Sequence, residues 1–115
     1  MTKAGERKVE TVERANGGAG FIMKEALLTP EQLGSHCGMF SQVTLKPNCE
    51  LGYHEHHGET ETYYILSGRG MYDDDGKAVP IGAGDVLFCE DGKGHGAKNT
   101  GNEDLVFVAL ILKTK

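Results

Sequence analysis

The sequence has no tryptophan, only three prolines and no long hydrophobic run. A membrane-spanning helix needs roughly 18 to 20 consecutive apolar residues, so we expect no membrane span. Lysine and arginine form no clustered stripe and the formal net charge is −5, which argues against a nucleic-acid surface. No apolar stretch follows the polar first residues, so we expect no signal peptide.

Cysteine is also scarce. Cys37, Cys49 and Cys89 are odd in number and widely spaced, which does not fit a disulfide framework. Disulfides belong to oxidising compartments, so three reduced thiols favour a cytoplasmic protein. We expect the cysteines to behave as small buried hydrophobic residues.

Glycine, in contrast, is abundant. Seventeen glycines stand mostly singly between short apolar runs in a chain of 115 residues, which is typical of many turns and short strands. The length fits one domain. We therefore predict an all-β sandwich or barrel of some eight strands over residues 21–115. Residues 1–20 are too polar to pack alone and are predicted to be a flexible segment that can pair with a sheet edge or a partner.

Individual strands are visible in the pattern. Apolar and polar residues alternate in the segment 38–46, which predicts a half-buried strand. The segment 21–28 fits either a strand or one helical turn, and Thr29-Pro30 after it resembles a helix start. Asp75-Gly76 predicts a hairpin turn. The segment 105–112 is apolar on both faces, so we expect the core on one side and another layer or a partner subunit on the other.

The histidines carry the chemical signal. His54 and His56 are two residues apart, so both side chains leave the same face of a strand. Glu61 follows after a short loop and opens the next strand-like segment. Two imidazoles and a carboxylate on one face indicate a metal site.

The spacing in this stretch is similar to the first motif of the cupin family. His54-x-His56, four residues, Glu61, six residues and Gly68 match every interval of that motif. The second cupin motif is matched from Gly84 to Asn99 with one substitution, by Gly84, Glu90 in place of the usual proline, Gly92, His95 and Asn99. Asn48 replaces the glycine that usually begins the first motif, and asparagine tolerates the left-handed backbone of such a turn.

The resemblance implies a double-stranded β-helix, or jelly-roll barrel, and commonly a homodimer. It also implies one divalent metal held by His54, His56, Glu61 and His95. Three imidazoles and a carboxylate suit Mn, Fe, Ni, Co, Cu or Zn better than Ca or Mg. Four protein ligands leave open positions on an octahedral ion, which is typical of a catalytic site.

Residues of the same strand parity are predicted to line the pocket around the metal. These are Met39, Ser41, Val43, Tyr63, Ile65, Ala97 and Asn99. His57 is predicted to lie at the rim, and Glu59 in solvent. The pocket is then narrow and mostly apolar, which suits a small oxygenated molecule.

The resemblance implies several functions between which the residues do not choose. Our leading hypothesis is a metal-dependent oxidoreductase or decarboxylase that acts on a small dicarboxylate or keto acid, with the metal as Lewis acid. The alternatives are a non-catalytic binding or sensing protein with the same metal, and a sugar or sugar-phosphate isomerase.

Overall fold

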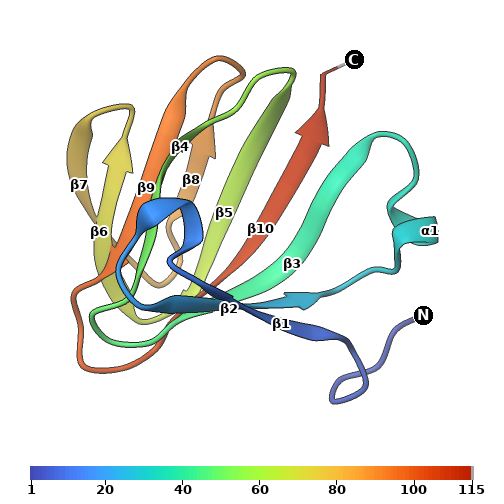
Figure 1. Ribbon diagram of the computed structural model, residues 1–115, viewed down its shortest axis with the longest axis horizontal. Coiled ribbons are helices and arrows are strands. Elements are labelled where there is room, and N and C mark those ends of the chain that lie inside the picture. Colours follow the sequence, from blue (N-terminus) through green and yellow to red (C-terminus); the bar gives the residue numbers. More distant parts are fainter. Residues whose placement is uncertain (115) are drawn as a thin grey trace.

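The computed structural model describes residues 1–114, which form two antiparallel β-sheets, as the all-β prediction required. These residues contain ten strands, where we expected about eight, together with one short α-helix and one 3-10 turn. Figure 1 shows the strands as two layers that enclose the core. Within residues 1–114, no helix has the length and apolar character of a membrane span.

The larger sheet has six strands in the order β1-β2-β3-β10-β5-β8. Their bounds are Val9–Glu13 (β1), Phe21–Ala26 (β2), Cys37–Leu45 (β3), Leu105–Lys113 (β10), Glu59–Ser67 (β5) and Val86–Cys89 (β8). The segment that fitted strand or helix is therefore a strand. The helix start that follows it is also real: α1 (Pro30–Leu33) begins with a capping box between Thr29 and Gln32.

The smaller sheet has four strands in the order β4-β9-β6-β7. Their bounds are Glu50–Glu55 (β4), Gly94–Asn99 (β9), Arg69–Asp74 (β6) and Lys77–Gly82 (β7). Asp75 and Gly76, both with positive φ, form the predicted hairpin turn between β6 and β7. Pro80 lies in β7, which is an edge strand of this sheet. Proline lacks a backbone N–H, and an edge strand tolerates this because it has a neighbouring strand on one side only.

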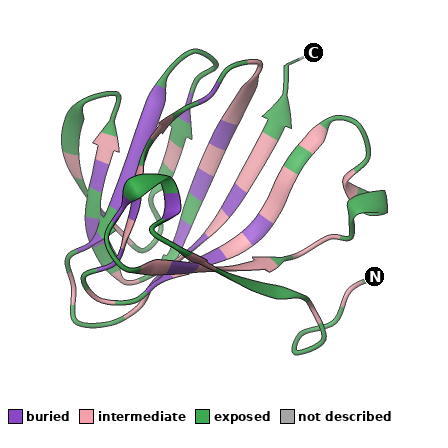
Figure 2. Ribbon diagram, in the orientation of Figure 1, coloured by how far each residue is buried: buried purple, intermediate pink, exposed green. Residues whose placement is uncertain are grey.

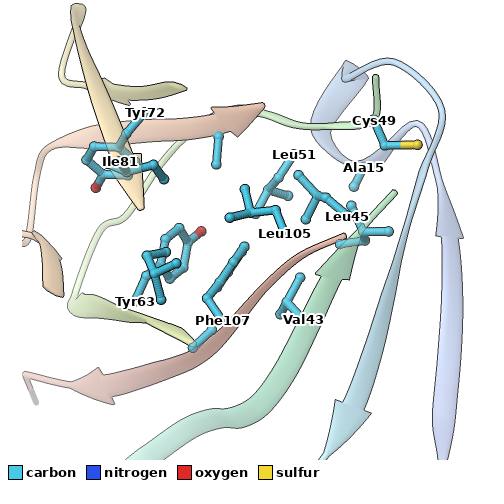
Figure 3. Packing of buried hydrophobic residues seen from close by; sticks show 14 residues of the cluster. Ala15, Val43, Leu45, Cys49, Leu51, Tyr63, Tyr72, Ile81, Leu105 and Phe107 are labelled. Atoms are coloured by element: carbon cyan, nitrogen blue, oxygen red, sulfur yellow. The ribbon is translucent and has the colours of Figure 1, made fainter. Parts of the chain in front are cut away.

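Burial alternates along the central strands, as Figure 2 shows. In β10, Leu105, Phe107 and Ala109 are buried, whereas Val106 and Val108 are half-buried. The inward residues of both sheets meet in one core, where Tyr63 packs on Phe107 with a ring-centroid distance of 4.4 Å (Figure 3). The core therefore covers the inner face of β10, whereas the outer face of this strand is partly exposed.

The N-terminal segment joins the larger sheet. Strand β1 pairs with β2 from Val9↔Glu25 to Glu13↔Phe21, which is the edge pairing that the sequence allowed. Ala15, in the 3-10 turn η1 (Ala15–Gly17), belongs to the core. The first residues are also tied to the sheet, since the Thr2 hydroxyl donates to the Leu27 carbonyl at 2.7 Å.

Two smaller predictions concern single residues. Asn48 has a φ of +68°, so asparagine does replace glycine in a left-handed turn. All three cysteines are free, with Cys49 and Cys89 buried and Cys37 half-buried.

Candidate metal centre

The four residues predicted to bind a metal lie together between the two sheets. His54 is in β4, His56 directly follows β4 and His95 is in β9, so all three imidazoles come from the side of the smaller sheet. Glu61 is in β5 of the larger sheet. Their potential ligand atoms all lie within 4.8 Å of one another. The backbone register explains the meeting, because His54 pairs directly with His95.

The same nitrogen of each imidazole points to the centre of the group. Nε2 of His95 lies 3.1 Å from Nε2 of His54 and 3.1 Å from Nε2 of His56. Oε1 of Glu61 lies 2.8 Å from Nε2 of both His56 and His95, and 3.5 Å from Nε2 of His54. Four ligand atoms therefore surround one point.

The other nitrogen of each imidazole has its own partner. Nδ1 of His54 donates to the Gly52 carbonyl at 2.8 Å. Nδ1 of His56 lies 2.8 Å from a carboxylate oxygen of Glu59, and Nδ1 of His95 lies 2.8 Å from the Tyr72 hydroxyl. A carbonyl and a carboxylate accept hydrogen bonds, so the proton of His54 and of His56 resides on Nδ1.

This arrangement fits a cation. With the protons of His54 and His56 on Nδ1, their Nε2 lone pairs face one another and a carboxylate, an arrangement that a positive ion at the centre stabilises. Histidine ligands of metals characteristically donate their second N–H to a carbonyl or carboxylate, which fixes the tautomer. His56, Glu61 and His95 are each no more than 5% exposed, so water does little to screen their charges.

Burial and hydrogen bonding oppose each other at the carboxylate. Burial raises the pKa of Glu61, but the imidazoles of His54 and His95 beside it outweigh burial and lower the pKa to about 2. Burial lowers the pKa of His95, which favours its neutral form, whereas at His54 the contact with Glu61 outweighs burial and raises the pKa. A charged carboxylate beside a neutral imidazole is the protonation state that metal binding requires.

Tyr63 adds a hydroxyl to the group. Its O–H donates to Oε1 of Glu61 at 3.2 Å, and its ring stacks on His95 with a centroid distance of 4.8 Å. Burial and the nearby charge of Glu61 raise the pKa of Tyr63 well above its ordinary value. Tyr63 is therefore a hydrogen-bond donor and not a base.

A cavity of about 340 Å³ reaches the group. Of the residues expected to line the pocket, Met39, Val43 and Tyr63 line this cavity. Ile65, Ala97 and Asn99 face inward but are not among its lining residues, and Ser41 lines a neighbouring cavity instead. The side chain of Asn99 is structural, because its amide donates to the carbonyls of Leu45 and Glu103 at 2.8 Å.

The segment that leads into β5 and the first residue of that strand differ from the prediction in one respect. His57 is exposed and pairs with Glu55 at 3.2 Å, consistent with a rim position. Glu59, however, was expected in solvent and instead lies against Nδ1 of His56. Glu59 follows the candidate ligand His56 by three residues, and this short separation was the feature of the sequence that could have predicted the contact.

Three further polar residues near the site were missed from the sequence. Tyr72 supports His95 from β6, and Lys24 and Asn16 line the cavity from the N-terminal part of the chain. Tyr72 carried no signal, because only the pairing of β6 with β9 brings it to His95. Lys24 and Asn16 lie outside the segment that resembles the two motifs, so the motif spacing could not predict their positions.

Comparisons with known proteins point in one direction. The family model described as "Cupin domain" matches residues 41–111. The chain is 40% identical over 112 residues to the "Oxalate-binding protein" of Thermotoga maritima, covering 97% of this chain and 93% of that protein. It is 36% identical over 59 residues to (S)-ureidoglycine aminohydrolase of Escherichia coli, but covers only 22% of that protein.

Solved structures agree on the fold. The crystal structure of a predicted oxalate decarboxylase from Thermotoga maritima has a TM-score of 0.93 at 40% identity, with 98% of each chain covered. KdgF from a Halomonas species has a TM-score of 0.77 at 18% identity, covering 98% of this chain and 92% of that one. The second likeness supports the fold alone.

Proposed function

Because the chain belongs to the cupin family, we propose that it binds a divalent transition metal and, through it, a small carboxylate such as oxalate. The observation that carries this proposal is the convergence of three Nε2 atoms and one carboxylate oxygen at the end of a cavity. The ligands would be His54, His56, Glu61 and His95. Mn, Fe, Ni, Co, Cu and Zn all suit this set of ligands, and metal supply decides among them as much as affinity does.

The size and lining of the cavity support a small ligand. About 340 Å³ is near the lower end of small-molecule sites. Apolar side chains form most of its wall, among them Ile22, Val43 and Leu51. The 40% identical relative is named for oxalate binding, and small dicarboxylates were the leading ligand class that the resemblance to cupins suggested.

The protein's own residues would orient the ligand and protect it from water. A bound divalent ion supplies Lewis acidity toward a carboxylate oxygen. The Tyr63 hydroxyl donates a hydrogen bond to the carboxylate of Glu61, and the Tyr72 hydroxyl is hydrogen-bonded to Nδ1 of His95. These contacts fix two of the four ligands before any ion binds, which lowers the ordering cost of binding.

Turnover is a separate question from binding. A metal-dependent oxidoreductase or decarboxylase is our leading activity. A non-catalytic binding or sensing protein is the second candidate, and one observation favours it. Apart from His54, His56 and Glu61, the described residues that line the cavity offer Lys24 and a tyrosine of raised pKa, but no further carboxylate or imidazole to move a proton.

The proposal is tested first on the metal. Protein purified without chelator is analysed for bound metal, and we expect about one ion per chain. The double variant His54→Ala, His95→Ala should lose it, because two of the four ligands are gone. His57→Ala is the matched control, since His57 is exposed and outside the group. A double variant that retains the parent's metal would overturn the assignment.

The second test concerns the ligand and its fate. Metal-loaded protein is titrated with oxalate by calorimetry and then incubated with oxalate, keto acids and catechols while oxygen uptake and carbon dioxide release are followed. Binding with release of carbon dioxide or uptake of oxygen supports the enzyme. Binding without either supports the binding protein. If no small carboxylate binds, the ligand class is wrong.

We further propose that the protein is a cytoplasmic homodimer. Three free cysteines suit a reducing compartment, and the outer face of the larger sheet is apolar enough to cover with a second copy.

A further inference from the structure

Lys24 is the one lysine or arginine among the described residues that line the metal cavity. It lies in β2, where Ile22, two residues earlier, is buried and lines the same cavity. Residues two apart leave the same face of a strand, so Lys24 is on the inward face. Its register partner on β3 is Val43, which also lines the cavity.

The ammonium group of Lys24 has no strong partner that would hold it away from the cavity. Nζ lies 3.7 Å from a carboxylate oxygen of Glu10, which is longer than a charged hydrogen bond. The Glu10 side chain is 59% exposed, and ion pairs at such sites contribute little. The four-carbon stem of lysine is flexible, so the charge can turn toward an anion inside the cavity.

Lys24 also stands where two cavities adjoin. A larger cavity of about 730 Å³ is bounded by the N-terminal segment, β2, α1 and the start of β3. Lys24 and Met39 line both cavities. A ligand that reaches the metal from this side passes the ammonium group.

The charges in the cavity favour a particular ligand class. Among the described residues that line the cavity, Glu61 carries the one carboxylate, so a divalent ion there leaves one positive charge, and Lys24 adds a second. A dianion neutralises both charges, whereas a monoanion leaves one of them without a partner inside the cavity. Asn16, held at a φ of +51°, adds a polar side chain to the same wall.

We infer that Lys24 is the specificity-determining residue of the site, and that its ammonium group binds the second carboxylate of a dicarboxylate whose first carboxylate is on the metal. The inference rests on the proposed function and deepens it. Lys24 selects dicarboxylates such as oxalate over monocarboxylates. It is not a metal ligand, so the metal content does not depend on it.

The test compares four proteins, each loaded with the metal found in the parent: the parent, Lys24→Met, Lys24→Arg and Lys8→Met. Lys24→Met keeps the length of the stem and removes the charge. Lys24→Arg keeps the charge. Lys8→Met is the matched control, because Lys8 lines the larger cavity but not the metal cavity. Calorimetry gives the affinities for oxalate and acetate, and metal analysis and thermal unfolding accompany each variant.

We expect Lys24→Met to weaken oxalate binding by roughly tenfold or more, the usual effect of losing a charged hydrogen bond. Acetate affinity, metal content and melting temperature should change little. Lys24→Arg should retain much of the preference for oxalate, and Lys8→Met should match the parent. If Lys24→Met does not fold, Lys24→Gln replaces it in the same comparison.

The possible failures are distinguishable. If the parent binds oxalate and Lys24→Met binds it equally well, the inference is wrong while the proposed function stands. If Lys24→Met loses the metal, Lys24 acts on the metal site and the inference is again wrong. If the loaded parent binds neither oxalate nor acetate, the proposed function fails and the inference fails with it.

Discussion

At the scale of single residues, each candidate histidine ligand is held by a chemically different partner. A backbone carbonyl holds His54, a carboxylate holds His56 and a phenol holds His95. The three partners come from three strands: Gly52 from β4, Glu59 from the start of β5 and Tyr72 from β6. The ring of His95 depends on the most distant contact, that of β6 with β9.

Removing the phenol tests this support. Tyr72→Phe keeps the ring in the core but leaves Nδ1 of His95 without its partner, so we expect metal affinity to fall by roughly 10- to 100-fold. The fold should persist, because phenylalanine fills the same volume. Competition with a metal chelator measures the affinity, and Tyr64→Phe, at an exposed tyrosine, is the control. Equal affinities of Tyr72→Phe and the parent would contradict the supporting role.

A second residue-scale prediction concerns the turn before β4. Asn48 has a φ of +68°, where a residue with an ordinary side chain is less stable by about 1 to 2 kcal/mol. Asn48→Ala should lower the free energy of unfolding by about this amount, whereas Asn48→Gly should change it little. Urea unfolding measures both. Equal stabilities of the two variants would show that backbone conformation does not matter here.

At the scale of elements, the sequence predicted which side chains face the interior, but not how far along each strand they lie from the candidate metal site. His95, Ala97 and Asn99 share one face of β9, and all three are buried, as their parity required. A strand advances about 3.3 Å per residue, so Asn99 lies about 13 Å along the strand from His95. None of the three lines the cavity, which His54, the register partner of His95, does line. The same reasoning separates Ile65 from Glu61 on β5.

The sequence allowed residues 1–20 to pair with a sheet edge, but it did not locate the strand β1 or the turn η1 within them. Strand β1 is mostly exposed and rich in charge, so no alternation of apolar and polar residues marks it. It forms only because β2 offers an edge. Gly52 contributes as well: a Cβ there would lie 2.2 Å from the Asn16 carbonyl oxygen, so the absent side chain lets η1 approach β4. Long-range contacts of this kind leave no local pattern.

The expected flexibility of residues 1–20 can be measured strand by strand. Strand β1 has a partner on one side only and little buried surface, whereas β3 lies between β2 and β10. We expect the amides of β1 to exchange hydrogen at least roughly tenfold faster than those of β3, because local opening costs less at an edge. Hydrogen exchange followed by NMR gives both rates. Equal protection would mean that the segment is as firmly folded as the core.

At the scale of the whole molecule, the larger sheet leaves apolar side chains on its outer face. Tyr64, Leu66, Val86 and Phe88 are exposed there on β5 and β8. Tyr64 is the register partner of both Val86 and Val108, so the face continues onto β10. Contiguous apolar surface of this kind is typical of interfaces.

The proposed homodimer is tested on this face. Light scattering at micromolar concentration should give twice the mass of one chain, and Phe88→Glu should reduce it toward that of the monomer, because the new charge would be buried between two copies. Met71→Glu, at an exposed methionine of the smaller sheet, should leave the mass unchanged. A monomeric mass for the parent would count against the dimer.

The placement of the candidate ligands has a consequence for the rate of unfolding. The histidines belong to the smaller sheet or its border, and Glu61 belongs to the larger sheet. An ion bound to all four would cross-link the two sheets, so the sheets could not separate without breaking bonds to the ion. Loaded protein should then unfold more slowly, and the ion should exchange slowly with its surroundings. The metal found after purification would then be the ion that was available to the chain when it folded.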